Sequence, residues 1–559
     1  MTPSRRAFGW GLVNAGICLL LAGPVVAGLV GILLPAFGVA PVVSAAEPGL
    51  AVFAALVAEP GLWRSIAVSG GSALVSTALA VALTALILAA AHGSRALVVA
   101  ERLLAPLLAV PHAAAALGIV FLFAPSGFIL RLLSPWATGF DAPPDIALLQ
   151  DRNGVALTLA LALKETPFLF LMALSALGQT RAAARMAVAR TCGHGRMLGF
   201  LVAVWPLIYR QLKLPVLAVL AFGASVVDMA LILGPTRPPT LAVRILSWLQ
   251  SADLSKWLVG AAASVVMVAL VAVLILVWRL GERLAGRLCL ALAARGPQPA
   301  GDGALRVAAL SLAALLAATM FLSFAGLFGL SFAGFWRFPD VVPAVMSPAA
   351  WVGRAPMLFS VLSQTLGVAL GTAMVALPLA VALLEAERRG RTVWWVIYAP
   401  LVAPQVSFLF GLNVLLIGAG VVPGVVAVTL THALFALPYA LIALSGPWRA
   451  LDPRYEALAA SLGRGPVARF TRVRLPLMVR PLFVTGALCV AVSVGLYVPT
   501  QMIGGGRVVT ATTEAVAAGA GGDRRLIGIF ATMQLAIPLL AFTLARVMPR
   551  LLLPRWRTV

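Results

Sequence analysis

Long apolar runs recur along this chain and are separated by short polar segments. The runs at 12–37, 155–177 and 258–278 approach or exceed the roughly 20 residues with which a helix crosses a bilayer. Because a backbone in lipid must satisfy its own hydrogen bonds, such runs predict spanning helices. The pattern predicts twelve of them, at 10–37, 65–91, 103–124, 155–178, 214–234, 257–278, 305–330, 360–384, 394–417, 424–445, 482–499 and 526–545. The predicted fold class is an all-α polytopic membrane protein.

The twelve predicted spans form two related groups of six. Matching residues lie 270 positions apart near the end of each group and 293 apart near its middle: Gly193 and Gly463, Pro206 and Pro476, Gly234 and Gly504, Pro111 and Pro404, Gly118 and Gly411. We therefore predict a first repeat at 1–294, a cytoplasmic linker at 295–304 and a second repeat at 305–559. Six spans per repeat make the repeats parallel, with a transport path expected between them.

Charge fixes the expected orientation. Hydrophobic residues make up 62% of the chain, and the net charge is +23. Most basic residues fall in alternate segments between the apolar runs, which is the distribution that holds a segment in the cytoplasm and not that of a nucleic-acid-binding surface. The apolar run after Arg5 and Arg6 is too long for a signal-peptide core, so we expect an uncleaved first span and cytoplasmic N- and C-termini.

No catalytic or metal-binding pattern accompanies these spans. The sequence has no GxxxxGK[ST] or HExxH motif, and its four cysteines and four histidines are widely scattered. We expect no cofactor, no metal site and no enzymatic activity in this chain, so any ATP hydrolysis would come from separate subunits.

One basic inside loop, at 446–480, carries an unusual local pattern. Asp452 and Pro453 are typical of a helix start, Gly463 can close that helix in the left-handed conformation, and Pro466 can open a second one. The pattern predicts a two-helix elbow on the cytoplasmic side. Its apolar side chains have no obvious core to enter, which indicates a partner: Leu458, Leu462 and Phe470.

This elbow resembles the EAA loop of binding-protein-dependent ABC importer permeases. The matching residues are Glu456, Ala457, Ala460, Gly463, Leu475 and Pro476. The resemblance implies two fused domains of the type I importer permease fold, in the bacterial inner membrane. It also implies that the loop docks on cytoplasmic ATPase subunits, two copies in all, which use ATP and Mg, and that a periplasmic binding protein delivers substrate. The loop at 179–213 is a degenerate copy, in which Met186 replaces the acidic residue while Ala187, Gly193 and Pro206 are kept.

The resemblance also bears on the substrate. The stretch 498–507 is similar to that of fused permeases assigned to thiamine systems, which are related to ferric-iron permeases, so it implies a thiamine-like or ferric-iron substrate. Two other functions stay open from the residues alone: an ion-gradient-driven secondary transporter and a non-transporting membrane scaffold.

Polar residues inside the predicted spans are the candidates for the substrate path, because ionisable groups at bilayer depth are costly. An interhelical ion pair or hydrogen bond is the competing interpretation of each of them. The candidates are Lys164, Glu165, Asp228, Asn413, His432 and Tyr497.

Overall fold

The computed structural model describes residues 3–39, 48–294, 302–388, 398–422 and 424–552. Within these ranges the regular elements are helices, joined by loops and turns, with an isolated antiparallel bridge between Ala333 and Met346. The predicted all-α class is confirmed. The long helices are α1 (Pro3–Gly31), α4 (Leu62–Ala91), α5 (Arg95–Leu108), α6 (His112–Phe123), α8 (Val155–Leu177), α11 (Trp205–Ser225), α14 (Ser255–Ala294), α15 (Asp302–Leu330), α17 (Ala355–Glu387), α19 (Gln405–Gly418), α20 (Val425–Ala450), α24 (Val479–Gly495) and α27 (Arg524–Leu552).

Ten candidate membrane spans lie in the described residues, and one bent helix pair brings the count to eleven. The ninth predicted span, 394–417, begins outside the described residues, and its described part, α19, has 14 residues. The predicted start of the fifth span at 214 was wrong. Helix α11 begins at Trp205, because Pro206 occupies its first turn instead of ending the preceding loop.

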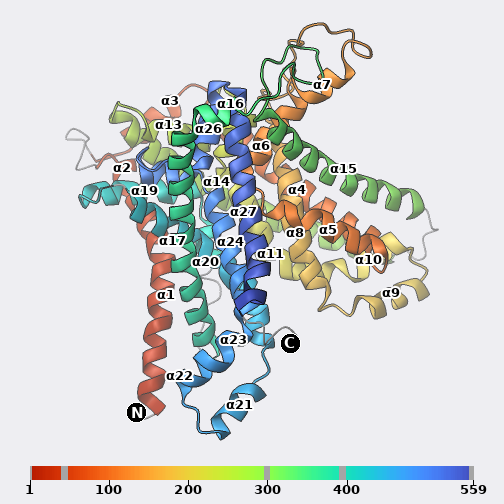
Figure 1. Cartoon of the computed structure of the whole chain (residues 1–559), viewed down its shortest axis with the longest axis vertical. Helices are drawn as coiled ribbons and strands as arrows, with labels where there is room; N and C mark the ends of the chain where they lie inside the picture. The colour runs from red at the N-terminus through yellow and green to blue at the C-terminus, as the bar shows by residue number, and fades with distance from the viewer. Residues whose placement is uncertain (1–2, 40–47, 295–301, 389–397, 423, 553–559) are drawn as a thin grey trace.

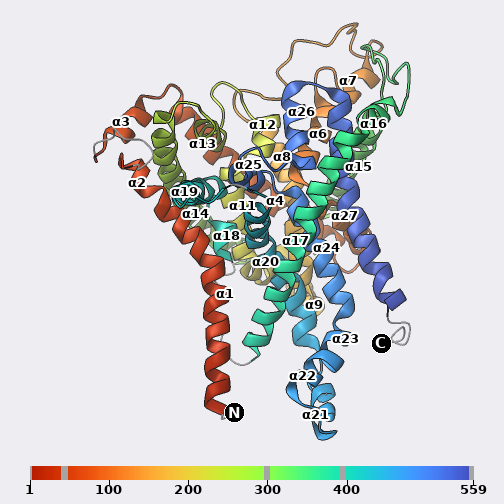
Figure 2. The same cartoon turned by 60° about the vertical axis from the view of Figure 1, so that its left-hand side comes forward.

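The first helix of each predicted repeat packs against the other repeat. Helix α1 lies along α19 and α17, whereas α15 lies along α6, α4 and α5 on the other side of the molecule (Figures 1 and 2). Both crossings use glycine: a Cβ at Gly411 would lie 1.8 Å from the carbonyl oxygen of Gly28, and one at Gly326 would lie 1.9 Å from the Phe121 ring. Small residues let helix backbones approach in a membrane, so these crossings lock the two repeats together.

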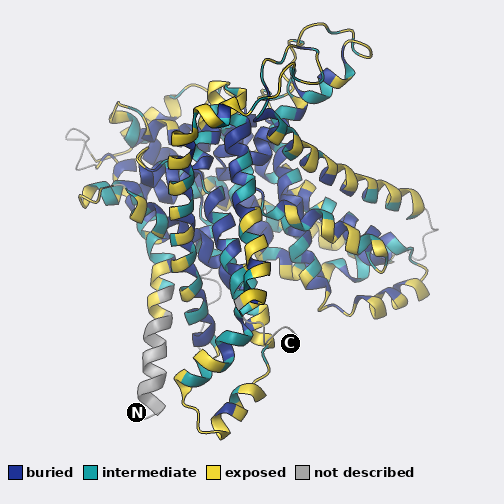
Figure 3. Cartoon of the chain, in the orientation of Figure 1, coloured by how far each residue is buried: buried dark blue, intermediate teal, exposed yellow. Residues whose placement is uncertain are grey.

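Exposed positions run along the outward faces of several long helices (Figure 3), and large apolar residues are among them. Leu315 on α15 is 62% exposed and Phe359 on α17 is 73% exposed. Lipid contact accounts for such apolar faces, because a helix in a bilayer needs no polar surface toward the acyl chains.

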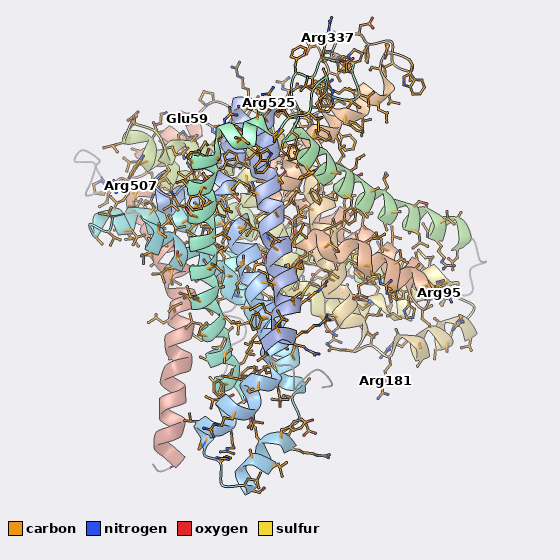
Figure 4. The ribbon with its side chains drawn as sticks, viewed as in Figure 1. Glu59, Arg95, Arg181, Arg337, Arg507 and Arg525 are labelled. Carbon is orange, nitrogen blue, oxygen red and sulfur yellow. The ribbon has the colours of Figure 1, made fainter. Side chains whose placement is uncertain are left out.

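The two ends of the molecule differ in what they carry. Helices α21 (Arg454–Ser461) and α22 (Pro466–Arg469) lie at the end where both termini are found, while α7 (Phe128–Leu133), α16 (Ala349–Gly353) and α26 (Ala511–Gly521) lie at the opposite end (Figure 1). Arg181 and Arg95 lie toward the end with the termini, and Glu59, Arg337 and Arg525 lie at the opposite one (Figure 4).

Candidate functional site: two elbows and an intramembrane polar cluster

The second elbow folds as two short helices joined by a tight turn. Helix α21 begins at Arg454, one residue later than predicted, and the Arg454 N–H donates to the Asp452 carboxylate over 2.8 Å. Gly463 has a φ of +74°, the left-handed conformation that its position after the helix predicted. Helix α22 continues through a π-helical turn at Phe470–Arg474 into Leu475–Leu477, where Pro476 lies, and meets α24 at a 72° bend.

Glu456 is half-buried and pairs with two arginines. Arg388, at the end of α17, places Nη1 3.3 Å from Oε1 and Nη2 3.1 Å from Oε2 of the Glu456 carboxylate. Arg474 pairs with the same carboxylate and, over 2.5 Å, with Glu385. The Arg474 side chain is 3% exposed and lies over the Trp448 ring. These charge-assisted bonds fasten the elbow to the end of α17.

The outward surface of the elbow is apolar. Leu458 is 63% exposed and Leu462 is 72% exposed, while Ala457 and Ala460 lie exposed beside them. The expectation that Phe470 lacks a core was wrong. It is half-buried, and its ring lies 6.5 Å from that of Trp448. The unpartnered face therefore centres on the two leucines.

The first elbow has the same shape and a different chemistry. It consists of α9 (Ala182–Thr191) and α10 (Arg196–Ala203), with Gly193 at a φ of +78°. Met186, in the place of Glu456, is buried, and Val204, in the place of Arg474, is fully buried. Ala187 is exposed, and Pro206 lies in the first turn of α11. In the first elbow, buried apolar side chains therefore take the place of the ion pair that stabilises the second elbow.

Charged groups in the first turn of α15 lie against the first elbow. The Met197 N–H, at the start of α10, donates to the Asp302 carboxylate over 2.9 Å, and the Arg196 guanidinium donates to the carbonyl of His92. Burial and the nearby Arg306 lower the pKa of the Arg196 guanidinium. The first turn of α15 thus helps to fix the first elbow.

The six polar residues predicted as substrate-path candidates do not all lie together in the structure. Lys164, Glu165, Asp228 and Tyr497 gather where the two repeats meet. Glu165 Oε1 lies 2.9 Å from His112 Nε2, and Lys164 interacts electrostatically with Glu165 and Asp228. Tyr497, from the second repeat, interacts electrostatically with Asp228.

His432 and Asn413 lie on α20 and α19 of the second repeat. His432 is 1% exposed, with Nδ1 2.8 Å from Ser493 Oγ and Nε2 2.9 Å from Thr500 Oγ1. Both ring nitrogens are thus used between helices of the second repeat, as an interhelical hydrogen-bond network requires. Asn413 is buried on α19.

Sequence reasoning missed several members of both sites. His112 and Tyr439 belong to the intramembrane cluster, and Tyr439 interacts electrostatically with Glu165. Arg388, Arg474 and Glu385 belong to the second elbow. The one available signal for His112 was its place directly after Pro111, the residue matched by Pro404 in the second repeat.

A hollow of about 410 Å³ opens at the end of the molecule opposite the elbows. Its polar lining comes mainly from Arg354, Asp523, Arg524 and Arg525, and Arg354 lies 3.6 Å from Asp523. The hollow lies where the end of α15 meets the start of α27, so it belongs to the second repeat.

Comparison with known proteins gives one informative relationship. No family model matches the chain. The chain is 30% identical over 442 residues to the inner membrane ABC transporter permease protein YnjC of Escherichia coli (strain K12), a match that covers 78% of each protein.

Proposed function

This chain belongs to the permeases of ABC transporters, and from that premise we propose that it is a fused, two-lobed importer permease of the bacterial inner membrane. It forms the substrate path between its two repeats and relies on separate cytoplasmic ATPase subunits, having no ATPase activity of its own. The observation that carries this proposal is the pair of matching helix–turn–helix elbows, α9–α10 and α21–α22, one in each half of the chain. The end of the molecule at which α21 and α22 lie (Figure 1) is the cytoplasmic one in the proposed orientation.

Equivalent contacts in the two halves support the two-repeat organisation. In the first half, the Leu241 N–H at the start of α13 (Leu241–Leu249) donates to Ser69 Oγ over 2.9 Å. In the second half, the Ala511 N–H at the start of α26 donates to Thr365 Oγ1 over 2.9 Å. Each bond ties an outer helix to the second long helix of its own repeat, so the halves share an internal plan.

The exposed leucines of the second elbow support docking on an ATPase. An apolar face displayed at a membrane protein's water-facing end is costly unless a partner covers it. ATP binding and hydrolysis in two such partners would move the elbows and rock the repeats about the path. A periplasmic binding protein would deliver the substrate at the opposite end. A thiamine-like compound or ferric iron is the substrate that the sequence resemblance implies.

Co-purification tests this proposal. We expect the tagged chain, expressed with the ATPase and binding-protein genes beside it, to retain the ATPase through detergent extraction. The reconstituted complex is expected to show ATPase activity that the loaded binding protein stimulates. Uptake that persists without ATP and follows an ion gradient would overturn the proposal in favour of a secondary transporter. Absence of both uptake and a bound ATPase would favour a scaffold.

A further inference from the structure

Three candidate membrane spans meet at the hollow of about 410 Å³ at the end opposite the second elbow. Helix α15 ends at Leu330, α17 begins directly after Arg354, and α27 begins at Arg524. All three of these residues line the hollow, whose volume lies within the range of about 300–1,000 Å³ that ligand pockets have. Because lipid headgroups begin where spanning helices leave the hydrocarbon core, the hollow lies at headgroup depth.

The hollow gathers positive charge on the side of the membrane where this chain is expected to carry little. Arg354, Arg524 and Arg525 line it, and Asp523 is the one carboxylate among the described lining residues. Most basic residues of the chain lie in the segments expected in the cytoplasm, so three arginines in one outer hollow depart from that distribution. Like charges repel one another, and an anion bound among them relieves the repulsion.

Two of these arginines have donors to spare. Arg524 Nη2 donates to Ser126 Oγ over 2.9 Å, which ties it to the first repeat. The Asp523 carboxylate accepts from the backbone N–H of Arg525 over 3.1 Å and lies 3.6 Å from the Arg354 guanidinium, longer than a good hydrogen bond. No described residue binds the Arg525 guanidinium. Arg354 and Arg525 can therefore both donate to a phosphate, the group that a guanidinium fits best along with carboxylate.

The rest of the lining is largely apolar and includes two aromatic side chains. Leu330 is buried, whereas Phe335 is 73% exposed. The Trp336 ring is held in place from two sides, because Arg131 Cζ lies 4.6 Å from its centroid and its indole N–H donates to the Asp340 carbonyl over 2.8 Å. Aromatic side chains of this kind favour the boundary between lipid and water. The hollow therefore fits a molecule with an anionic part and an apolar part.

We infer that the hollow binds the phosphodiester headgroup of an anionic membrane lipid. Arg354 and Arg525 donate to the phosphate oxygens, and the Asp523 carboxylate accepts from hydroxyl groups such as those of a glycerol headgroup. Phe335 and Trp336 contact the adjoining apolar part of the lipid. The inference goes beyond the proposed function, because it assigns a ligand that the chain holds and does not transport.

An acidic surface of a partner protein is the competing occupant of such a hollow. Two observations favour a lipid. Three spanning helices meet at the hollow, so lipid is its neighbour in the membrane, and the apolar wall at Phe335 and Trp336 gives an acidic surface nothing to contact. Inorganic phosphate lacks the apolar part, and a choline headgroup would place a second cation among the arginines.

Lipid binding to the purified full-length chain tests the inference. The chain, stripped of lipid in dodecyl maltoside, is titrated with dioleoyl-phosphatidylglycerol or dioleoyl-phosphatidylcholine, and retained lipid is counted by native mass spectrometry. We expect one phosphatidylglycerol to be retained and to raise the Tm, with binding of phosphatidylcholine at least tenfold weaker. Equal binding of the two lipids would overturn the inference. Displacement of phosphatidylglycerol by inorganic phosphate or by a glutamate-rich peptide would assign the hollow to a free anion or an acidic protein, and would also overturn it.

Substitutions locate the binding in the hollow. Arg525→Gln is expected to raise the apparent Kd for phosphatidylglycerol at least fivefold, and Arg525→Gln with Arg354→Gln to raise it further. Arg525→Lys, which keeps the charge, should regain part of the affinity. The control is Arg507→Gln, which removes an exposed arginine that lies away from Arg525 (Figure 4) and should change the Kd less than twofold.

The Tm without lipid separates lost binding from lost folding. Arg525→Gln should leave that Tm unchanged, because no described residue binds the Arg525 guanidinium. If Arg525→Gln and the double variant bind phosphatidylglycerol as tightly as Arg507→Gln does, the lipid lies elsewhere on the chain and the inference is wrong.

Discussion

The Glu456 carboxylate of the second elbow is clasped by the Arg388 guanidinium at the end of α17, with Nη2 3.1 Å from Oε2 and Nη1 3.3 Å from Oε1. The acidic residue expected to dock an ATPase is therefore engaged within the chain. Docking through Glu456 stays a prediction. The exposed Leu458 and Leu462 offer the free surface, while Glu456 fastens the elbow to the end of α17.

Removing Glu456 should loosen the elbow. Glu456→Met leaves Arg474, 3% exposed, with one carboxylate partner in place of two. Breaking a buried pair from one side costs about 3–5 kcal/mol, and the partial exposure of Arg388 reduces this to about 1–3 kcal/mol. We expect a lower Tm of the purified complex and reduced stimulation of the ATPase, with normal membrane insertion.

The first elbow supplies the control for this change. There, Met186 and Val204 occupy the places of Glu456 and Arg474 and are both buried. The double variant Glu456→Met with Arg474→Val should therefore recover part of the lost Tm, because it copies apolar packing that the chain already uses. A double variant less stable than Glu456→Met alone would contradict the equivalence of the two elbows.

Gly463 should tolerate no side chain without strain. Its φ is +74°, and a Cβ added there would meet no atom within 4 Å, so backbone conformation alone decides the cost of Gly463→Ala. That cost is about 1–2 kcal/mol for a non-glycine residue in the left-handed region. We expect faster trypsin cleavage at Arg464 and weaker ATPase stimulation. Gly465→Ala is the matched control, since Gly465 has a φ of −67° and equally open surroundings, and it should behave as the unsubstituted chain does.

Gly411 should be required for the crossing of α1 and α19. A methyl group there would lie 1.8 Å from the Gly28 carbonyl oxygen, so Gly411→Ala must push the helices apart. Overpacking of this kind costs about 1–3 kcal/mol. Thermal unfolding in detergent should show a lowered Tm. Gly367→Ala, on α17, where an added Cβ would meet no atom within 4 Å, should leave Tm unchanged, and equal Tm values for the two variants would contradict the crossing.

Local signals explain what could be predicted from the sequence. Run length identified the spanning helices, and the glycine and proline positions of the second elbow predicted its turn, because Gly463 fits a left-handed residue. Pro206 led to the wrong predicted start of the fifth span, because a proline can either end a helix or lie in the first turn of the next one. The missed partners are distant in sequence: Arg388 lies 68 residues from Glu456, and His112 lies 53 residues from Glu165. Such pairs depend on tertiary packing, which no local pattern encodes.

The native cysteine of the first elbow can report whether both elbows dock. Cys192 ends α9 as an exposed free thiol, and Leu462, 72% exposed, ends α21 at the corresponding position. A maleimide that cannot cross membranes should modify Cys192 in inside-out vesicles and leave it unmodified in right-side-out cells. Bound ATPase should slow this reaction at least fivefold, because docking covers the end of the elbow.

Leu462→Cys in a Cys192→Ser chain gives the matched measurement on the second elbow. Cys18 and Cys289, which are partly exposed, are replaced by serine in both chains so that each reports a single position. We expect the ATPase to protect both positions, since both elbows share the helix–turn–helix shape and lie toward the same end of the molecule. Protection of Leu462→Cys alone would show that the Met186 copy does not dock, and would overturn the two-elbow arrangement. If the ATPase protects neither position, the elbows do not dock on it and do not couple it to the chain.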